Sequence, residues 1–250
     1  MSGHSKWAGI KHKKAATDAK KGQLYTKIIK EINIAARTGG GNPDTNSSLR
    51  AAMAKAKEAN MPSENVKMAI KRGTGELPGV TYETVMYEAY GQGGVAILIE
   101  ALTDNKNRTT AEVRNILSKK GGNMAGAGSV SWMFTQKGYI LIDKKDIAED
   151  ALMDIVLDAG AEDVKHDEKN FEVLTSTADL EKVKQSLQDK NVKWQAAELT
   201  MIPSSTVKLN SQDARAILSL VEALEEHEDV QEVHANFDIP DEILEEIAAE

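Results

Sequence analysis

The order of apolar patterns between residues 138 and 201 limits most strongly what this 250-residue chain can fold into. Alternating or continuous apolar runs predict strands, and apolar residues at helical spacing predict helices. Their order is β-α-β-β-α-β, which is typical of the ferredoxin-like arrangement. We therefore expect residues 131–204 to form one sandwich of helices on a sheet. The strands are predicted at 138–142, 161–166, 170–175 and 193–201, and the helices at 146–159 and 178–189.

The segments on either side of this unit each contain half of a second one. Residues 82–130 show two strand patterns and then a helix pattern, and residues 205–240 show a short strand, a helix and an alternating run. Neither half can cover both faces of a sheet alone. We expect the halves to pair into one discontinuous α/β domain, into which residues 131–204 are inserted. Contact between residues 95–101 and 231–237 would confirm this pairing.

The first 73 residues divide into an arm and a helical region. Residues 1–21 have almost no apolar periodicity and predict a basic flexible arm, and residues 22–73 predict a three-helix bundle. The helices are expected at about 24–38, 47–60 and 63–72, with a linker at 74–81. The expected fold class is α+β and multidomain: an N-terminal three-helix bundle plus two α/β domains, one of them ferredoxin-like and inserted in the other.

Charge is divided unequally between these parts. Residues 1–72 hold 15 Lys and Arg against 5 Asp and Glu, a net charge of +10, whereas residues 73–250 hold 16 against 34, a net charge of −18. Because phosphate backbones attract Lys and Arg whatever the base sequence, the cationic head predicts a nucleic-acid contact. The acidic body repels phosphate and confines the contact to the N-terminal face, within a Debye length of about 10 Å.

The candidate nucleic-acid-binding residues are cations of the arm and bundle and two ring side chains of the arm. Lysines and arginine would contact phosphates, while Trp7 and His12 would stack on exposed bases. The alternative for Trp7 is that it anchors the arm on the bundle. Lys30, Arg37, Arg50 and Lys57 are also expected on the bundle surface. The full candidate set is Lys6, Trp7, Lys11, His12, Lys13, Lys14, Lys20, Lys21, Lys27, Lys55, Lys67, Lys71 and Arg72.

Helices 47–60 and 63–72, separated by a tight turn, resemble a helix-turn-helix. The second helix would present polar side chains to a DNA groove: Ser63, Glu64, Asn65, Lys67 and Lys71. Against this interpretation, any three-helix bundle contains such a pair, the turn lacks its usual glycine, and proteins that read bases this way are generally dimers. Base-specific reading of DNA therefore stands as one alternative beside contact with phosphates.

Two further segments are candidate contact surfaces. Asn105, Lys106 and Arg108 open a helix, where backbone donors can hold a phosphate, and the alternative is a helix cap followed by a turn. The glycine-rich loop 121–132, GGNMAGAGSVSW, is interpreted as a mobile contact surface. It does not fit a dinucleotide-binding loop, because it follows a helix and Ser131 stands where the last glycine of G-x-G-x-x-G should be.

No residue set points to catalysis, and we expect neither a cofactor nor a metal. The chain has no cysteine, its five histidines lack metal-ligand spacing, and the common nucleotide, zinc-protease and serine-hydrolase motifs do not occur. No signal peptide or membrane span is visible, so we expect a cytosolic, non-enzymatic protein without a small-molecule substrate. The acidic residues Glu222, Glu225, Glu226, Glu228 and Asp229 are interpreted as a solvated helix end, with a partner or cation surface as the alternative.

Long strings of the sequence suggest a family. They are GHSKWAGIKHKKAATDAKKGQLYTKIIKEI, AAMAKAKEANMPSENVKMAIKRGTGE, and YEAYGQGGVAILIEALTDNKNRTTAEVRNILSKKGG followed by GSVSWMF. On these strings the chain closely resembles the YebC/PmpR family over nearly all of its length. The resemblance implies an N-terminal helical domain and two α/β domains, one interrupted by the other.

The resemblance implies two different functions. Proteins of this family are described as probable transcriptional regulators that bind promoter DNA, and this is the function we expect. Mitochondrial relatives activate translation of a cytochrome c oxidase subunit, and bacterial relatives are tied to ribosomes stalled on proline runs. The alternative is therefore a ribosome-associated translation factor that binds ribosomal RNA and relieves elongation stalls.

Overall fold

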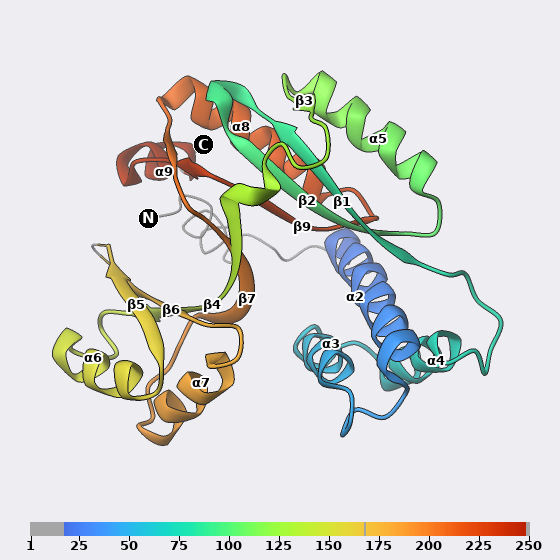
Figure 1. Cartoon of the computed structure of the whole chain (residues 1–250), viewed down its shortest axis with the longest axis horizontal. Helices are drawn as coiled ribbons and strands as arrows, with labels where there is room; N and C mark the ends of the chain where they lie inside the picture. The colour runs from blue at the N-terminus through green and yellow to red at the C-terminus, as the bar shows by residue number, and fades with distance from the viewer. Residues whose placement is uncertain (1–17, 168, 249–250) are drawn as a thin grey trace.

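The computed structural model describes residues 18–167 and 169–248 and shows three parts (Figure 1). A helical bundle is followed by a discontinuous α/β part, and a second α/β unit lies between the two halves of that part. The bundle and the inserted unit extend from the same side of the discontinuous part, one at each end (Figure 1). This architecture confirms the predicted α+β fold class.

The N-terminal bundle consists of α2 (Asp18–Gly39), α3 (Ser47–Glu58) and α4 (Ser63–Gly73). Helices α3 and α4 each pack against α2, around a core that includes Ile28, Ile32 and Leu49. Gly73 permits a close approach of α4 to α2, because a Cβ atom there would lie 2.5 Å from the carbonyl oxygen of Asn33. Since α2 begins at Asp18, residues 18–21 of the predicted arm are helical.

Asn46 holds the turn between α2 and α3. Its side-chain oxygen accepts a hydrogen bond from the backbone N–H of Leu49 at 3.0 Å and so caps α3. Its side-chain amide donates to the carbonyl oxygens of Ala35 and Gly40, both at 2.8 Å. A cap of this kind contributes about 1 kcal/mol to stability, and here the same buried side chain also satisfies carbonyls at the end of α2.

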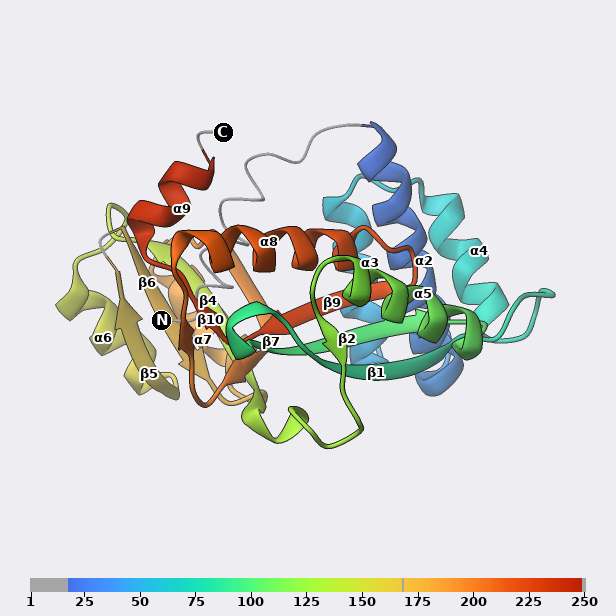
Figure 2. The same ribbon diagram turned by 90° about the horizontal axis from the view of Figure 1, so that it is seen from above.

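The discontinuous part is an antiparallel sheet in the order β3-β1-β2-β9, with helices on one face (Figure 2). Ile97 of β2 lies opposite Ala235 of β9, which confirms the predicted contact between the two halves of this part. The strands are β1 (Glu83–Tyr90), β2 (Ala96–Thr103), β3 (Asn123–Met124) and β9 (Val230–Ala235), and the covering helices are α5 (Lys106–Lys119) and α8 (Ser211–Glu225).

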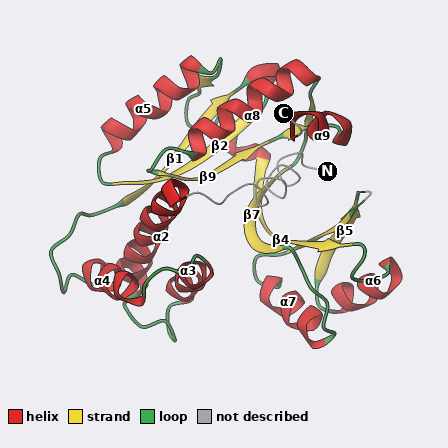
Figure 3. Ribbon diagram, turned by 180° about the vertical axis from the view of Figure 1, so that it is seen from behind, coloured by secondary structure: helices red, strands yellow, loops and turns green. Residues whose placement is uncertain are grey.

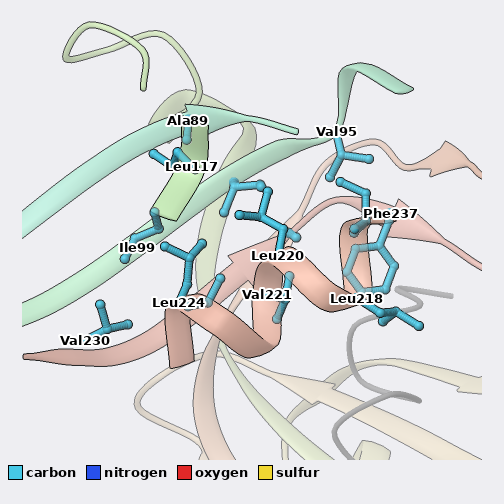
Figure 4. Packing of buried hydrophobic residues seen from close by; sticks show 14 of the residues in the cluster. Ala89, Val95, Ile99, Leu117, Leu218, Leu220, Val221, Leu224, Val230 and Phe237 are labelled. Atoms are coloured by element: carbon cyan, nitrogen blue, oxygen red, sulfur yellow. The ribbon is translucent and has the colours of Figure 1, made fainter. Parts of the chain in front are cut away.

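Both halves contribute to one apolar core between this sheet and its helices (Figure 4). Ile99 from β2, Leu224 from α8 and Phe237 are fully buried in it. Truncating a buried leucine to alanine costs roughly 2–5 kcal/mol, so each such contact ties the N-terminal half to the C-terminal half. The core of the discontinuous part therefore needs residues from both sides of the inserted unit.

The inserted unit has the predicted ferredoxin-like topology. Its strands lie in the order β5-β6-β4-β7 with antiparallel neighbours, and its helices cover one face of the sheet (Figure 3). Ile140, Val173 and Val183 are among the residues of the core between them. The strands are β4 (Phe134–Asp143), β5 (Ala161–His166), β6 (Asn170–Thr175) and β7 (Ala196–Pro203), and the helices are α6 (Glu149–Asp158) and α7 (Leu180–Asp189).

Some elements differ from the sequence prediction. Strand β4 begins at Phe134 instead of residue 138, because Phe134 pairs with Pro203 of β7. Helix α9 (Asp241–Ala248) was not predicted, and its Leu244 is buried in the core of the discontinuous part. Short elements complete the fold: η1 (Gln92–Gly94), η2 (Ser131–Met133), and the parallel pair β8 (Val207–Lys208) and β10 (Phe237–Asp238).

The predicted domain boundaries stay a proposal. We divide the chain into an arm (1–21), a bundle (22–73), a discontinuous α/β domain (82–130 with 205–240) and an inserted domain (131–204). Within the two described ranges, no helix has the length and apolar character that crossing a lipid bilayer requires.

Candidate nucleic-acid interface

Exposed cations lie on α4 and near the start of α2. Lys67 and Lys71 are spaced i, i+4 on α4 and are both exposed, and Arg72 follows in the last turn. Cations in that turn interact favourably with the negative end of the helix dipole. Lys21 is also exposed, and its Nζ lies 5.9 Å from the centroid of the Tyr25 ring. Arg37, Arg50 and Lys57 are exposed too, as predicted.

Lys55 is exposed but already paired within the bundle. Its Nζ lies 3.0 Å from Oε2 of Glu31 on α2. Burial lowers the pKa of Lys55, but the neighbouring Glu31 carboxylate outweighs this effect and raises the pKa above its ordinary value. A phosphate at this position would have to compete with Glu31.

Lys27 and Lys30 face the discontinuous part. Lys27 Nζ donates to the carbonyl oxygen of Glu225 at 2.7 Å, so this predicted phosphate contact joins the bundle to the end of α8. The expected surface position of Lys30 is wrong, because the residue is 5% exposed. Its Nζ lies 5.7 Å from the centroid of the Tyr82 ring and donates to the carbonyl oxygen of Glu228 at 3.0 Å. Both lysines hold the molecule together where the bundle meets the body.

Lys30 forms an ion pair with the buried carboxylate of Asp229. The residue is 1% exposed, and its Oδ1 accepts a hydrogen bond from Lys30 Nζ at 2.5 Å. Its Oδ2 accepts from Arg108 at 2.8 Å and from the Thr109 hydroxyl at 2.6 Å. Burial alone would raise the pKa of Asp229, but the bonds from Lys30, Thr109 and Arg108 hold it well below its ordinary value. The carboxylate is therefore charged and fully paired.

At the start of α5, two residues of the predicted phosphate contact bind groups of the protein itself. The Asn105 side chain accepts the Arg108 backbone N–H at 3.2 Å, so it caps the helix, as the alternative interpretation held. The Arg108 guanidinium reaches Asp229 and also Asp104, at 3.0 Å. These bonds to carboxylates raise the pKa of Arg108. Lys106 is exposed beside them. Asp229 and Asp104 thus bind the Arg108 guanidinium, and a phosphate at this helix start would have to compete with these two carboxylates.

The fold also brings together Glu112, His227 and Asp229, whose possible ligand atoms lie within 4.8 Å of one another. His227 Nδ1 accepts the Asp229 backbone N–H at 3.1 Å, which leaves Nε2 to donate to Glu112 at 2.9 Å. Because Lys30 and Arg108 already neutralise Asp229, a further cation would meet repulsion there. We interpret the group as an ion-pair network.

The acidic residues in the last turn of α8 and just after it have two different environments. Glu222, Glu226 and Glu228 are exposed, as expected of a solvated helix end. The interpretation is wrong for Asp229, which is buried. Sequence reasoning missed this role because one Asp in an acidic run looks like its neighbours.

Helices α3 and α4 resemble a helix-turn-helix in part. The turn between them lacks glycine, and Asn60 takes the left-handed conformation instead, with φ of 55°. The predicted contact residues Ser63, Glu64 and Asn65 are exposed on α4 with Lys67 and Lys71. However, both helices pack mainly against α2 and only weakly against each other. The face of α4 is accessible, and side chains of α3 and α4 share one core with α2.

The glycine-rich loop after α5 is fastened to the sheet by Glu88. This buried carboxylate of β1 accepts backbone N–H groups of Gly128 at 2.7 Å, Val130 at 2.6 Å and Ser131 at 3.0 Å. Burial raises the pKa of Glu88, but these hydrogen bonds outweigh it and lower the pKa below its ordinary value. Hydrogen bonds to Glu88 thus fasten residues 128–131 of the loop that the sequence predicted to be a mobile contact surface.

The remaining predicted contacts belong to the arm. Lys6, Trp7, Lys11, His12, Lys13 and Lys14 lie outside the described residues. Lys20 belongs to α2 by its backbone. For these positions the sequence prediction stands as a proposal.

Comparison with known proteins gives full-length matches. Residues 5–76 match the family model "TACO1/YebC protein N-terminal domain", and residues 82–237 match "TACO1/YebC second and third domain". A probable transcriptional regulatory protein of Dictyoglomus turgidum is 55% identical over 249 residues, which cover 99% of this chain and 100% of the relative. One of Syntrophobacter fumaroxidans is 53% identical with the same coverage.

A solved structure is also similar. The crystal structure of a conserved hypothetical protein from Aquifex aeolicus aligns with a TM-score of 0.79 and 46% sequence identity. The alignment covers 91% of this chain and 94% of that one.

Proposed function

The chain belongs to the TACO1/YebC family, and on that premise we propose that it is a non-enzymatic, cytosolic regulator of gene expression that binds nucleic acid through its N-terminal part. Its relatives carry the name probable transcriptional regulatory protein, which supports regulation as the general role. Transcriptional regulation through DNA is the specific function we propose. No catalytic residue, cofactor or small-molecule substrate forms part of the proposal.

The observation that carries the proposal is the accessibility of cations on the bundle. Lys67, Lys71 and Arg72 are exposed together on the last turns of α4. Lys27 and Lys30, in contrast, are used where the bundle meets the body. The bundle thus separates cations that hold the fold together from cations that face solvent, and the second group is available to a phosphate backbone. The basic arm, with Lys11, Lys13 and Lys14, extends the same charge.

Ribosomal RNA is the second candidate target. The packing of α3 and α4 mainly against α2 favours it, because a helix-turn-helix works as a pair of helices, of which the first crosses the DNA backbone and the second lies in the groove. Binding through phosphates and shape does not require such a unit. In that case the protein acts as a ribosome-associated translation factor that relieves elongation stalls.

Charge reversal on α4 tests the phosphate contact. Lys67→Glu combined with Lys71→Glu should weaken binding to nucleic acid and reduce the salt dependence by about 0.7–0.9 per lost contact. The matched control reverses Lys190 and Lys193, which are exposed on the inserted unit. Equal affinities for the α4 variant and the wild type would contradict the proposal.

Two further measurements separate the targets. Asn65→Ala should relax base preference on duplex DNA if α4 reads bases, whereas equal affinity of the wild type for all duplexes argues against promoter reading. Cosedimentation with ribosomes in a cell lysate supports the translation factor, since a protein that binds DNA alone stays at the top of the gradient.

A further inference from the structure

Two exposed aromatic side chains lie where the glycine-rich loop meets β1, and an exposed methionine lies four residues before one of them on the same strand. Trp132 is 72% exposed, Tyr90 is 40% exposed and Met86 is 43% exposed. The Trp132 Nε1–H and the Tyr90 hydroxyl both donate to the carbonyl oxygen of Ser129, at 3.0 and 3.1 Å. Tyr90 and Met86 point from the same face of β1, because side chains alternate along a strand. We call Trp132, Tyr90 and Met86 the aromatic patch.

The aromatic patch is held in place from beneath. Glu88 lies between Met86 and Tyr90 on β1 and points to the same face, where it accepts three backbone N–H groups of residues 128–131. The Ala125 N–H donates to the carbonyl oxygen of Glu88 at 2.7 Å. The loop that carries Trp132 is therefore ordered before any partner arrives, so little conformational entropy is lost on binding.

The bond from Nε1 to Ser129 leaves the ring faces of Trp132 as its main binding surface. A tryptophan face attracts a cation more strongly than the face of any other side chain. The patch has no charged residue of its own in residues 121–136, but it belongs to a body with a net charge of −18 over residues 73–250.

The acidic surroundings continue across the sheet. Met86 lies opposite Glu100 of β2, and Glu100 lies opposite Glu232 of β9. Met86, Glu100 and Glu232 are therefore neighbours across the sheet, and their side chains point to the same face. Lys55 and His234 lie close to these carboxylates and oppose part of their charge. The excess of negative charge on the body as a whole still favours a basic ligand over a phosphate chain.

We infer that the aromatic patch is a docking site for an arginine- or lysine-bearing segment of a protein partner, with a cationic side chain placed over the Trp132 ring. Tyrosine, tryptophan and methionine at an uncharged centre, with charge around it, is the composition of protein interfaces. The site lies on the body, so its failure and that of the nucleic-acid proposal are distinguishable. Together the two sites would let the protein join a nucleic acid to a basic protein.

The indole N–H signal of Trp132 in a nitrogen-15 NMR spectrum reports on this site directly. The chain contains 3 tryptophans, so Trp132→Phe identifies the signal by its loss. An oligoarginine peptide should shift the Trp132 signal to saturation, and an oligoglutamate peptide should not. Trp132→Ala should weaken peptide binding roughly 2- to 30-fold, which is the range of a cation–π contact.

The controls decide between occupants. Leu199→Ala, at a residue 42% exposed on β7, should leave peptide affinity unchanged, and Trp132→Ala should leave binding to nucleic acid unchanged. A Trp132 signal that moves with oligouridylate instead of the peptide would overturn the inference in favour of base stacking. A signal that moves only with the protein's own concentration would overturn it in favour of self-association. Peptide affinity unaffected by Trp132→Ala would also reject it.

Discussion

Lys30 of α2 and Asp229, which are 199 residues apart in the sequence, form a buried ion pair with 2.5 Å between Nζ and Oδ1. Asp229 also accepts hydrogen bonds from Arg108 and Thr109 of α5. One carboxylate thus links the bundle to α5 and to the segment after α8. The position of the bundle relative to the sheet therefore depends on this pair. A lysine from the cationic head contributes here to the fold and not to a nucleic-acid surface.

Asp229→Asn should destabilise the protein strongly. The substitution leaves Lys30 buried without its counter-charge, and breaking a buried pair in this way costs about 3–5 kcal/mol. Urea unfolding measures the change. Glu228→Gln, at the exposed neighbouring residue, is the control and should change stability by less than about 0.5 kcal/mol. A loss below about 1 kcal/mol in Asp229→Asn would show that the pair does not hold the bundle in place.

The same pair predicts a loss of stability in acid. Because the pKa of Asp229 is lower in the folded protein than its ordinary value of about 3.9, its stabilising effect is fully present above that value. The effect decreases as the pH falls below about 4 and disappears below the folded-state pKa. Unfolding curves of the wild type and Asp229→Asn should therefore converge as the pH is lowered through this window. A constant difference between them would contradict the assignment.

Glu100→Gln should stabilise the protein at neutral pH. Burial raises the pKa of Glu100, and Glu232 on the neighbouring strand raises it further. A raised pKa means that charging Glu100 costs more in the folded state, so stability is lost as the pH rises through the carboxyl pKa values. We expect a gain of about 0.2–1 kcal/mol at pH 7. The gain should vanish below about pH 4, where both forms are neutral. Glu83→Gln, at an exposed residue of β1, serves as the control.

Charge reversal in the arm should weaken binding to any nucleic acid. Lys11→Glu, Lys13→Glu and Lys14→Glu replace three cations of the arm by anions. The sequence has no acidic residue before Asp18, so no neighbour along the chain neutralises these lysines. The slope of log affinity against log salt should decrease by about 0.7–0.9 for each lost phosphate contact. Filter binding or fluorescence anisotropy over a salt series measures this slope. Unchanged binding would reject a role for the arm.

Local patterns were sufficient to predict most elements. Strands β5 and β6 occupy the predicted ranges 161–166 and 170–175. Their bounds could be predicted because alternating apolar residues and turn residues are local features of the sequence. The pairing of β2 with β9 followed from counting incomplete units. Helix α9 was missed although Pro240 precedes it and Ile243, Leu244 and Ile247 have helical spacing. Eight residues with many acids give a weak signal unless the apolar core that covers them is known.

The sequence by itself determined the order of the elements, the ferredoxin-like insertion and the division of charge between head and body. Tertiary structure decided which charges are available. Lys30 and Lys67 look alike in the sequence, yet one is buried against Asp229 and the other is exposed on α4. Periodicity depends on neighbours along the chain, whereas the role of a charge depends on its distance in space to an opposite charge and on its burial, which the packing of distant segments creates.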